Sequence, residues 1–541
     1  MAMILALSSF KGANTYTNAK ALPDGLGVFA RNLDNSHGDM RGIPAANQVA
    51  TLTGLASQQI SLYRMGRDVA SDTQYWLSSN VDTDYCRSLL ATDPNELTYY
   101  TDGVKPKFTD TTLLGSAPYP GAYRTLGVPA PASAMVASIS SAGTSAKDES
   151  RVYLDTFVRV HNGRSEESAP NSLVTSITCK SDATIALSSL AAMPSGQHGI
   201  TKRRIYCSTD GGEFLRVTEL AVATTSYSDT GTRTLVLETG GDLDRPAWLE
   251  PPDGLKGLQT LWNSMAGGFV GKSYRVCEAG QMHAWPIEYE GVLPDTIVGA
   301  ASWGTNWLLC TTGVPYLVTG STPAGMRNVP IYFKQACVSK RSVVGVQHGV
   351  CWASPNGLCY YGQNGMANLT ERILSPGDWA AMNPASIIGL NSGRYYIGFY
   401  VNGSTRGGFM IDTLQPDSII WLTQGAYGAF VDPISGQVYL LDSAYAIRKW
   451  GTGATMPAEF TSMNKRAPMK CCPGAAKVVA TAYPVTFSLY ANGALKFTKT
   501  VNSEEPFRLP AGYMAEFFQI KLTGAGPIEA ALLADEIADL P

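Results

Sequence analysis

The sequence predicts a mainly β fold, made of many short strands and few long helices. The chain of 541 residues contains 54 Gly, 31 Pro and 26 Tyr, and only 16% of its residues are charged. Glycine and proline favour turns and tyrosine favours strands, whereas long surface helices need a larger share of charged residues. A chain of this length exceeds one hydrophobic core, so about two to four domains are expected.

Residues 337–379 show the strand pattern most clearly. Three short runs in this stretch are rich in β-branched, aromatic or small apolar residues: 342–346, 349–353 and 357–362. The pairs Asn356-Gly357 and Asn364-Gly365 reach the positive φ of tight hairpin turns at low cost. Strands this short do not bury a core alone, so several such units must stack.

Residues 1–50 predict an extended arm that joins the sheets after it, because turn residues punctuate it about every ten positions. Residues 51–131 continue with hairpins, one of which pairs residues 61–70 with residues 73–78. This region is the first part of a set of small sheets.

A different segment opens after the linker GVPAPAS at residues 127–133. About seven short strands are predicted within about 115 residues, which is the strand count of an immunoglobulin-like sandwich. The clearest are 152–160, 173–179, 184–187, 202–208, 213–217 and 225–230. Residues 164–170 separate the first two of these strands and include the predicted Glu-Ser-Ala-Pro turn at 167–170. The order of a tyrosine-containing strand, a Glu-Ser-Ala-Pro turn and a closing Thr-Ser-Tyr-Ser-Asp-Thr segment resembles a fibronectin type III domain, placed at residues 132–245.

The earlier pattern resumes over residues 246–455, in units of about 40–50 residues, which is the repeat length of propeller blades. The units in this part include 265–289, 297–319, 387–421 and 428–450, in addition to the meander at 337–379. We therefore predict a β-propeller formed by residues 51–131 and 246–455 and interrupted by the fibronectin type III-like sandwich. Closure of a ring removes exposed sheet edges.

Residues 456–541 predict a small C-terminal β-sandwich. Its strands are expected at 477–482, 484–491, 495–501 and 514–523. The tail at 528–540 has helical propensity, but its place after four strands favours a closing strand, and both alternatives stay open.

Charge and hydropathy exclude several classes of protein. Lys and Arg number 41 against 44 Asp and Glu, a net charge of −3, so no basic field for holding nucleic acid or an anionic membrane is expected. No apolar run approaches the roughly 18 residues that cross a bilayer, which predicts no membrane insertion. The first residues lack a basic region and their apolar run ends at Leu7, unlike a secretory signal. The 10 cysteines contain no CxxC pair and are predicted to be buried, reduced thiols.

The nearest approach to a nucleotide-binding motif is AGGFVGKS at residues 266–273. Ala266 replaces the first glycine of the phosphate-binding loop, and Ser273 leads into a predicted strand. A phosphate loop must instead open a helix, whose first N–H groups bind the anion. A hairpin turn is the favoured interpretation.

The acidic residues and histidines show no catalytic pattern. The carboxylate pairs are Asp82/Asp84, Glu166/Glu167, Asp242/Asp244 and Glu288/Glu290. An i, i+2 pair on a strand shares one face, as a glycosidase or metal site requires, yet a solvated strand face is the commoner case. The five histidines are dispersed, at 37, 161, 198, 283 and 348, and no GxSxG accompanies them. Two short basic patches, at 202–204 and 340–341, are expected to form local ion pairs or rim contacts. No catalytic, cofactor-binding or metal-binding residue is predicted, and no enzymatic activity.

Several segments in joint order resemble the tail nozzle proteins, also called tail tubular B-type proteins, of short-tailed bacteriophages. These segments are LPDG at 22–25, ARNLD at 30–34, MHAWP at 282–286, TGVPY at 312–316, CVSKRS at 337–342, SPNGL at 354–358, YPVT at 483–486 and PFRLP at 506–510. The similarity covers nearly the whole chain. It rests on packing motifs and not on catalytic ones.

The resemblance implies a protein of the virion tail that is assembled in the bacterial host cytoplasm. It implies a ring, usually a homohexamer, below the portal and adaptor proteins, with fibres or spikes attached outside. Double-stranded genomic DNA would pass transiently and without sequence preference through the ring. Neither a cofactor nor a metal is implied. Ser339, Lys340 and Arg341 are the candidate assembly contacts, expected to hold blade to blade or subunit to subunit.

Two alternatives from other classes remain. A glycan-binding or glycan-depolymerising tail protein on the same propeller is motivated by the Trp and Tyr content and by Glu288 and Glu290. A cellular propeller scaffold would form no ring with an axial hole.

Overall fold

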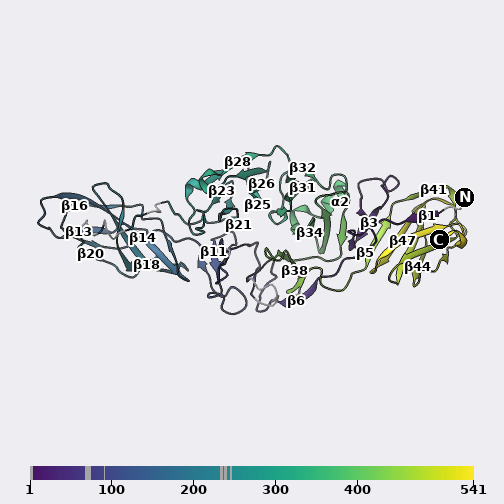
Figure 1. Ribbon diagram of the computed structural model, residues 1–541, viewed down its shortest axis with the longest axis horizontal. Helices are drawn as coiled ribbons and strands as arrows, with labels where there is room; N and C mark the ends of the chain where they lie inside the picture. The colour runs from purple at the N-terminus through teal and green to yellow at the C-terminus, as the bar shows by residue number, and fades with distance from the viewer. Residues whose placement is uncertain (1–3, 67–74, 91, 232–235, 237–240, 244–246) are drawn as a thin grey trace. The chain divides into compact units, whose positions relative to one another are not determined.

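The computed structural model describes residues 4–66, 75–90, 92–231, 236, 241–243 and 247–541, and it confirms a mainly β fold (Figure 1). The chain divides into two compact units. Unit 1 comprises residues 1–81, 298–317 and 329–541, and unit 2 comprises residues 82–297 and 318–328. Each unit therefore combines segments that are far apart in the sequence.

Unit 2 contains two four-stranded antiparallel sheets that share a core. The first has the order β12-β11-β10-β9, with strands β9 Asp84–Arg87, β10 Thr98–Thr101, β11 Lys107–Thr109 and β12 Arg124–Thr125. The second has the order β21-β22-β23-β24, with strands β21 Lys256–Thr260, β22 Ala266–Val270, β23 Ser273–Val276 and β24 Glu290–Val292. Tyr99, Phe108, Leu255, Met282 and Trp285 belong to one buried cluster that joins the two sheets.

A two-sheet sandwich also lies in unit 2. One sheet has the order β13-β17-β20, with β13 Val136–Ser141, β17 Thr184–Ser188 and β20 Tyr227–Asp229. The other contains β14 Asp148–His161, β15 Arg164–Glu167, β16 Thr175–Lys180, β18 Ile200–Thr209 and β19 Leu215–Ala221. Tyr153, Ile185 and Ile205 are fully buried between the sheets.

The sandwich corrects the sequence prediction at two points. The stretch at 164–170, which was predicted to separate two strands, begins with strand β15, which pairs with the end of β14. The turn itself is Asn162-Gly163, where both residues have positive φ. The polar residues of Arg164–Glu167 gave no strand signal in the sequence. Pairing with a neighbouring strand can form a strand where the local strand propensity is low. Strand β13 was not predicted.

In unit 1 the meander at 337–379 forms the sheet β29-β30-β31-β32. Its strands are β29 Val344–Val346, β30 Gly349–Ser354, β31 Gly357–Gly362 and β32 Gly365–Asn368. The strands predicted at 349–353 and 357–362 are confirmed. The strand predicted to begin at Ser342 begins two residues later, because Lys340–Ser342 forms the 3-10 turn η3. Strand β32 was missed.

The next sheet contains β33 Ile388–Ser392, β34 Tyr395–Asn402, β35 Thr405–Asp412 and β36 Ile420–Leu422. Helix α2 Pro376–Ala381 and the 3-10 turn η4 Pro384–Ser386 lead into it. Ser375 caps the helix, because its hydroxyl accepts a hydrogen bond from the Asp378 N–H at 3.1 Å.

Two further sheets of unit 1 involve the N-terminal region. Strands β37 Gly428–Val431, β38 Val438–Leu441 and β39 Ala446–Lys449 are completed by β6 Asn47–Thr51, which pairs with β39. Strand β7 Ser61–Arg64 pairs with β8 Trp76–Ser79, as the predicted hairpin required. The parts of that prediction at 67–74 lie outside the described residues.

Four more strands lie in residues 297–330. They are β25 Ile297–Trp303, β26 Asn306–Thr311, β27 Tyr316–Thr319 and β28 Arg327–Pro330, and the boundary between the units runs through them. A short 3-10 turn, η2 Pro323–Gly325, precedes β28.

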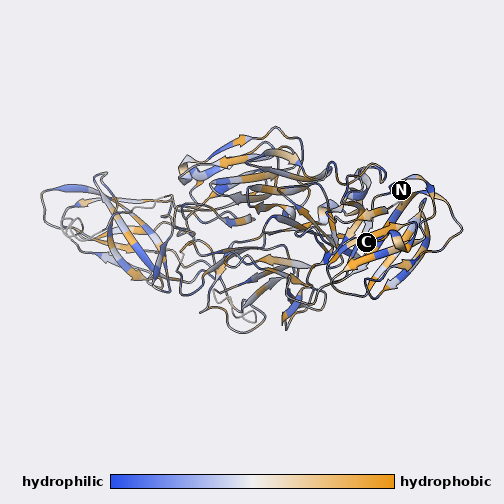
Figure 2. Cartoon of the chain, turned by 45° about the vertical axis from the view of Figure 1, so that its right-hand side comes forward, coloured by the Kyte–Doolittle hydropathy of each residue, from blue (hydrophilic) through white to orange (hydrophobic). Residues whose placement is uncertain are grey.

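The C-terminal region of unit 1 is a set of antiparallel strands, as predicted. They are β40 Ala458–Ser462, β41 Lys465–Cys471, β42 Ala475–Ala480, β43 Val485–Ala491, β44 Ala494–Val501, β45 Phe507–Arg508, β46 Ala515–Gly524 and β47 Ile528–Ala534. The tail is therefore a strand, followed by the 3-10 turn η5 Ile537–Asp539. Buried and half-exposed residues alternate along β46, and hydrophobic and hydrophilic segments alternate along these strands in Figure 2.

The N-terminal arm is extended, and its strands pair with C-terminal strands as well as with a strand of the small sheets. Strand β1 Ile4–Leu7 pairs with β47, and β3 Leu26–Arg31 pairs with β40 and, at Arg31, with β36. The short strands β2 Gly12–Ala13, β4 Leu33–Asp34 and β5 Arg41–Gly42 complete the arm.

Candidate assembly site

The three candidate assembly residues lie in the connection between β28 and β29. Ser339 is buried, and its hydroxyl donates a hydrogen bond of 2.8 Å to the carbonyl of Ile387, immediately before β33. Lys340 and Arg341 are half-buried members of η3. The carbonyl of Lys340 accepts a hydrogen bond of 3.2 Å from the N–H of Val343.

Arg341 contacts a third part of unit 1. Its guanidinium donates a hydrogen bond to the carbonyl of Ile60, which immediately precedes β7. Ser339 and Arg341 therefore join the connection to two other sheets of the same chain. A hydrogen bond from a charged donor to a backbone carbonyl is stronger than a neutral one.

Ser342 forms several hydrogen bonds in this connection, although it was not among the candidate assembly residues. It is fully buried, its hydroxyl donates to the Ser339 carbonyl at 2.7 Å, and it accepts from the Ala353 N–H at 2.9 Å. Its carbonyl accepts a hydrogen bond of 3.0 Å from the Tyr396 hydroxyl. The only sequence signal is a serine in a polar segment, where its hydroxyl can satisfy backbone groups.

Replacing Arg341 with alanine is expected to lower the free energy of unfolding of unit 1 by about 1–3 kcal/mol, because the Ile60 carbonyl loses a charged donor. The yield of assembled oligomer is expected to fall with it. Urea denaturation and light scattering after size-exclusion chromatography measure both effects. Arg372→Ala is the matched control, because Arg372 is exposed. A stable, normally assembled Arg341→Ala protein would contradict this role.

The loop that resembles a phosphate-binding motif is a hairpin, as predicted. Strand β22 ends at Val270, and Gly271 and Lys272 form the turn into β23, with Val270 paired to Ser273. The ammonium of Lys272 donates a hydrogen bond of 2.6 Å to the carbonyl of Pro294. The Lys272 side chain thus contributes to the fold of this sheet.

The carboxylates Glu288 and Glu290 do not share a strand face. Glu288 lies exposed in the 3-10 turn η1 Ile287–Tyr289, and Glu290 begins β24, because the chain turns after Pro286. Glu290 forms an ion pair with Arg275 on β23. Burial raises the pKa of the Glu290 carboxyl, but the hydrogen bonds from Arg275 and Ser273 and the charge of Arg275 together hold the pKa below its ordinary value.

The other acidic pairs also have structural partners. Asp84 accepts a hydrogen bond of 2.6 Å from the N–H of Gly257. Glu166 and Glu167 are neighbours on β15 and bond different arginines, Arg159 and Arg204. Asp244 lies outside the described residues. Within the described part of the chain, no group of three or more His, Cys, Asp or Glu side chains is arranged to hold a metal ion.

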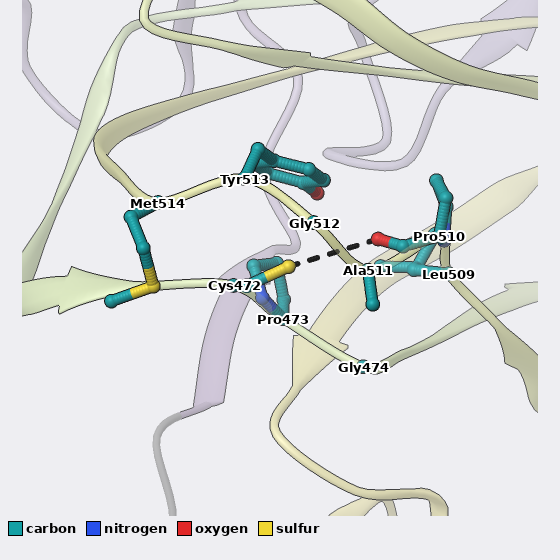
Figure 3. A pocket seen from close by; sticks show the side chains of 9 residues that line it. All are labelled: Cys472, Pro473, Gly474, Leu509, Pro510, Ala511, Gly512, Tyr513 and Met514. Atoms are coloured by element: carbon teal, nitrogen blue, oxygen red, sulfur yellow. Dashed lines mark hydrogen bonds between the residues drawn. The ribbon is translucent and has the colours of Figure 1, made fainter.

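The cysteines are reduced, as predicted, and eight of the ten are buried. Half-buried Cys472 lines a small pocket together with Leu509, Pro510, Tyr513 and Met514 (Figure 3). Burial raises the pKa of the Tyr513 hydroxyl to about 12. None of the nine residues that line the pocket carries an opposite charge that would stabilise a thiolate.

Three of the five histidines, although dispersed in the sequence, lie in one region of unit 2. His161, His198 and His283 all lie near Arg159 and Glu166 in unit 2. Their separations in sequence carried no signal, because the sheets of unit 2 bring the three segments together. In the described residues no helix is long and apolar enough to span a bilayer.

Comparisons with known proteins add little. No family model and no curated protein sequence matches this chain. The solved structure of AztD from Citrobacter koseri is 10% identical, with a TM-score of 0.25 over 70% of this chain and 99% of that protein. PorZ of Porphyromonas gingivalis is 10% identical, with a TM-score of 0.27 over 83% of this chain and 82% of that protein. YCF48 bound to a D1 peptide is 8% identical, with a TM-score of 0.24 over 50% of this chain and 85% of that protein. Similarities this low carry no argument about ligand, partner or activity.

Proposed function

We propose that the chain is a structural component of the tail of a short-tailed phage. It forms a ring-shaped nozzle below the portal and adaptor, through which genomic DNA is ejected and to which fibres or spikes attach. The observation that carries the proposal is that segments resembling the nozzle family occupy turns and buried connections. SPNGL holds the turn between β30 and β31, CVSKRS holds the connection at Ser342, and MHAWP includes the buried Trp285.

The finer fold that we propose is a β-propeller interrupted by a fibronectin type III-like sandwich. In the described residues, groups of short strands succeed one another along the chain: β7–β8, β9–β12, β21–β24, β25–β28, β29–β32, β33–β36, and β37–β39 with β6. The sandwich of β13–β20 falls between the second and the third. The pairing of N-terminal β6 with β39 supports ring closure, because the first and last segments then complete one sheet.

The charge balance supports a conduit. A wall rich in Lys and Arg would retain phosphates and slow the passage of DNA. The chain instead has a net charge of −3, so that six copies would carry −18. We propose a neutral to acidic lumen in a homohexamer, with DNA passing transiently and without sequence preference. The inserted sandwich then serves as a surface for contacts with other proteins.

Electron microscopy of the isolated oligomer or of the intact particle tests this function. Six copies around an axial hole are expected, in the tail below the portal. The bore is expected to lack a continuous lining of Lys and Arg. One copy per virion, or a bore lined continuously by these residues, would overturn the proposal.

The glycan-depolymerising alternative predicts a different result. Incubation with polysaccharide from the host surface is expected to leave the polymer length unchanged, for the wild type and for Glu288→Gln alike. The structural reason is that Glu288 and Glu290 lie on different elements and Glu290 is paired with Arg275. Chain cleavage by the wild type that disappears in Glu288→Gln would establish the alternative. Size-exclusion chromatography of the polysaccharide measures it.

A further inference from the structure

Three of the five histidines meet at one place, where the sandwich of β13–β20 adjoins the sheet of β9–β12 in unit 2. We call this place the junction. It consists of Asp110, Thr125, Arg159, Glu166, His161, His198 and His283. Histidine is the side chain whose ordinary pKa places its change of charge between about pH 5 and pH 8.

Arg159 on β14 is the centre of the junction. Its side chain is only 1% exposed, and its Nη1 donates to the carbonyls of Thr125 at 2.8 Å, Gly127 at 3.2 Å and His198 at 3.1 Å. Its Nε donates to Glu166 at 2.6 Å, and the guanidinium lies 4.7 Å from the centre of the Phe108 ring. One buried arginine thus ties the sandwich to the chain around β12, where the inserted segment begins.

Two of the histidines face carboxylates. His161, at the end of β14, bonds Asp110, which follows β11 and is fully buried. Asp110 also accepts a hydrogen bond of 2.8 Å from Asn162. The Nδ1 of His283 lies 3.8 Å from the carboxylate of Glu166. Both of these rings therefore lie beside a carboxylate and not beside a cation.

His198 is different, because it faces cations. It is 6% exposed, and its Nε2 must donate to the carbonyl of Ser195 at 3.0 Å, since a carbonyl only accepts. Its Nδ1 therefore accepts the hydroxyl proton of Thr125 at 2.8 Å. Burial chiefly, and the charges of Lys105 and Arg159, hold the pKa of His198 below its ordinary value.

The residues around His198 leave little space for its ring to move. Gly196 has a φ of +126°, and a Cβ on it would stand 2.8 Å from the His198 Nε2. On the side of β12, Arg124 donates a hydrogen bond of 3.1 Å to the side chain of the adjacent Gln197. The ammonium of Lys105 faces two carboxylates, Glu250 at 3.8 Å and Asp253 at 3.9 Å.

We propose that the junction is an acid-sensitive lock, which holds the sandwich in one orientation on the β9–β12 sheet while His198 is neutral and releases it when His198 gains a proton. Protonated Nδ1 becomes a donor, so the Thr125 hydroxyl must rotate and its own proton loses its acceptor. A second positive charge also appears beside buried Arg159. Because the folded pKa is the lower one, the stabilisation is complete above the ordinary pKa of 6.5 and is lost as the pH falls through the folded value.

Distances between two spin labels test the lock in the full-length chain. The labels are placed at Val104→Cys, near β11, and at Ser176→Cys, on β16, since both side chains are exposed. Cys471 and Cys472 are replaced by serine, and the eight other thiols are buried. One narrow distance peak is expected at about pH 8, and its loss at about pH 5, on either side of the histidine pKa.

Three variants test whether His198 causes the loss of the narrow peak in acid. His198→Gln keeps a donor toward Ser195 and carries no charge, so it is expected to keep the narrow peak at both pH values. Arg159→Met is expected to lose the peak at both, with circular dichroism showing retained β structure. His37→Gln, at an exposed position, is expected to behave as the wild type.

A wild-type peak that stays narrow in acid overturns the proposal, and this result does not depend on any variant at His198. A His198→Gln protein that loses its peak in acid as the wild type does also overturns it. In that case another titrating group, outside the contact of His198 with Thr125, would control the orientation.

Discussion

Replacing Asp432 with alanine is expected to lower the free energy of unfolding of unit 1 by about 3–5 kcal/mol, because it leaves a buried arginine without its carboxylate. The side chains of Arg64 on β7 and Asp432 after β37 are 2% and 4% exposed and form an ion pair. Asp432 also accepts a hydrogen bond of 2.9 Å from the N–H of Ile434. Urea denaturation followed by tryptophan fluorescence measures the effect.

Aromatic rings surround this ion pair and exclude water from it. Trp76 on β8 packs edge to face against Tyr439 with ring centres 5.0 Å apart, and Tyr63 packs against Phe430 at 5.2 Å. The guanidinium of Arg64 lies 5.7 Å from the Tyr439 ring. Water therefore does not replace the missing carboxylate, and the sheet of β7 and β8 is expected to loosen from the sheet of β37–β39.

Two further variants separate charge from packing at this site. Asp24→Ala is the control, because the Asp24 side chain is 86% exposed although it also faces a lysine. The double variant Arg64→Leu/Asp432→Leu removes both charges and is expected to be less destabilising than Asp432→Ala. If the single and double variants are equally destabilised, loss of packing and not an orphaned charge is the cause.

Replacing Trp285 with alanine is expected to lower the free energy of unfolding of unit 2 by about 3–5 kcal/mol, the usual cost of removing a large buried aromatic side chain. Trp285 is fully buried in the cluster shared by the β9–β12 and β21–β24 sheets. Its indole N–H donates to the carbonyl of Met282 at 2.8 Å, and its backbone N–H donates to the carbonyl of Leu249 at 2.8 Å. Thermal and urea unfolding measure the loss.

The comparison with Trp285→Phe sharpens this prediction. Phenylalanine keeps most of the apolar volume but lacks the indole N–H, so a smaller loss of stability is expected. Leu173→Ala is the control in the same unit, because Leu173 is 58% exposed. An alanine variant as stable as the control would show that the MHAWP segment is not needed for packing. The resemblance of that segment would then need another explanation.

The sequence predicted best the strands that have turn-forming residues at both ends. The run at 357–362 is bounded by two Asn-Gly turns, and the structure has a strand with the same bounds. The tail after residue 528 has helical propensity. It forms strand β47 because it pairs with β1 on one side and β42 on the other. Propensity is a weak prior that sheet pairing overrides.

The candidate site was predictable only in part. The basic pair at 340–341 and the resemblance of CVSKRS to the nozzle family predicted a role in contacts for Ser339 and Arg341. The partners of these residues, the Ile387 and Ile60 carbonyls, belong to segments that no local pattern links to them. Ser342 was missed because a buried serine hydroxyl looks like any other serine in a turn until its neighbours are known.

The sequence by itself determined the mainly β class, the hairpin turns and the absence of strong net charge, since these follow from residue types and from spacings of a few positions. Only the tertiary structure decided that β6 completes the sheet of β37–β39, that Arg64 meets Asp432, and that His161, His198 and His283 lie near the ion pair of Arg159 and Glu166. The physical reason is that short-range geometry sets strands and turns. Pairing between distant strands depends instead on burying apolar surface and satisfying buried polar groups throughout a unit.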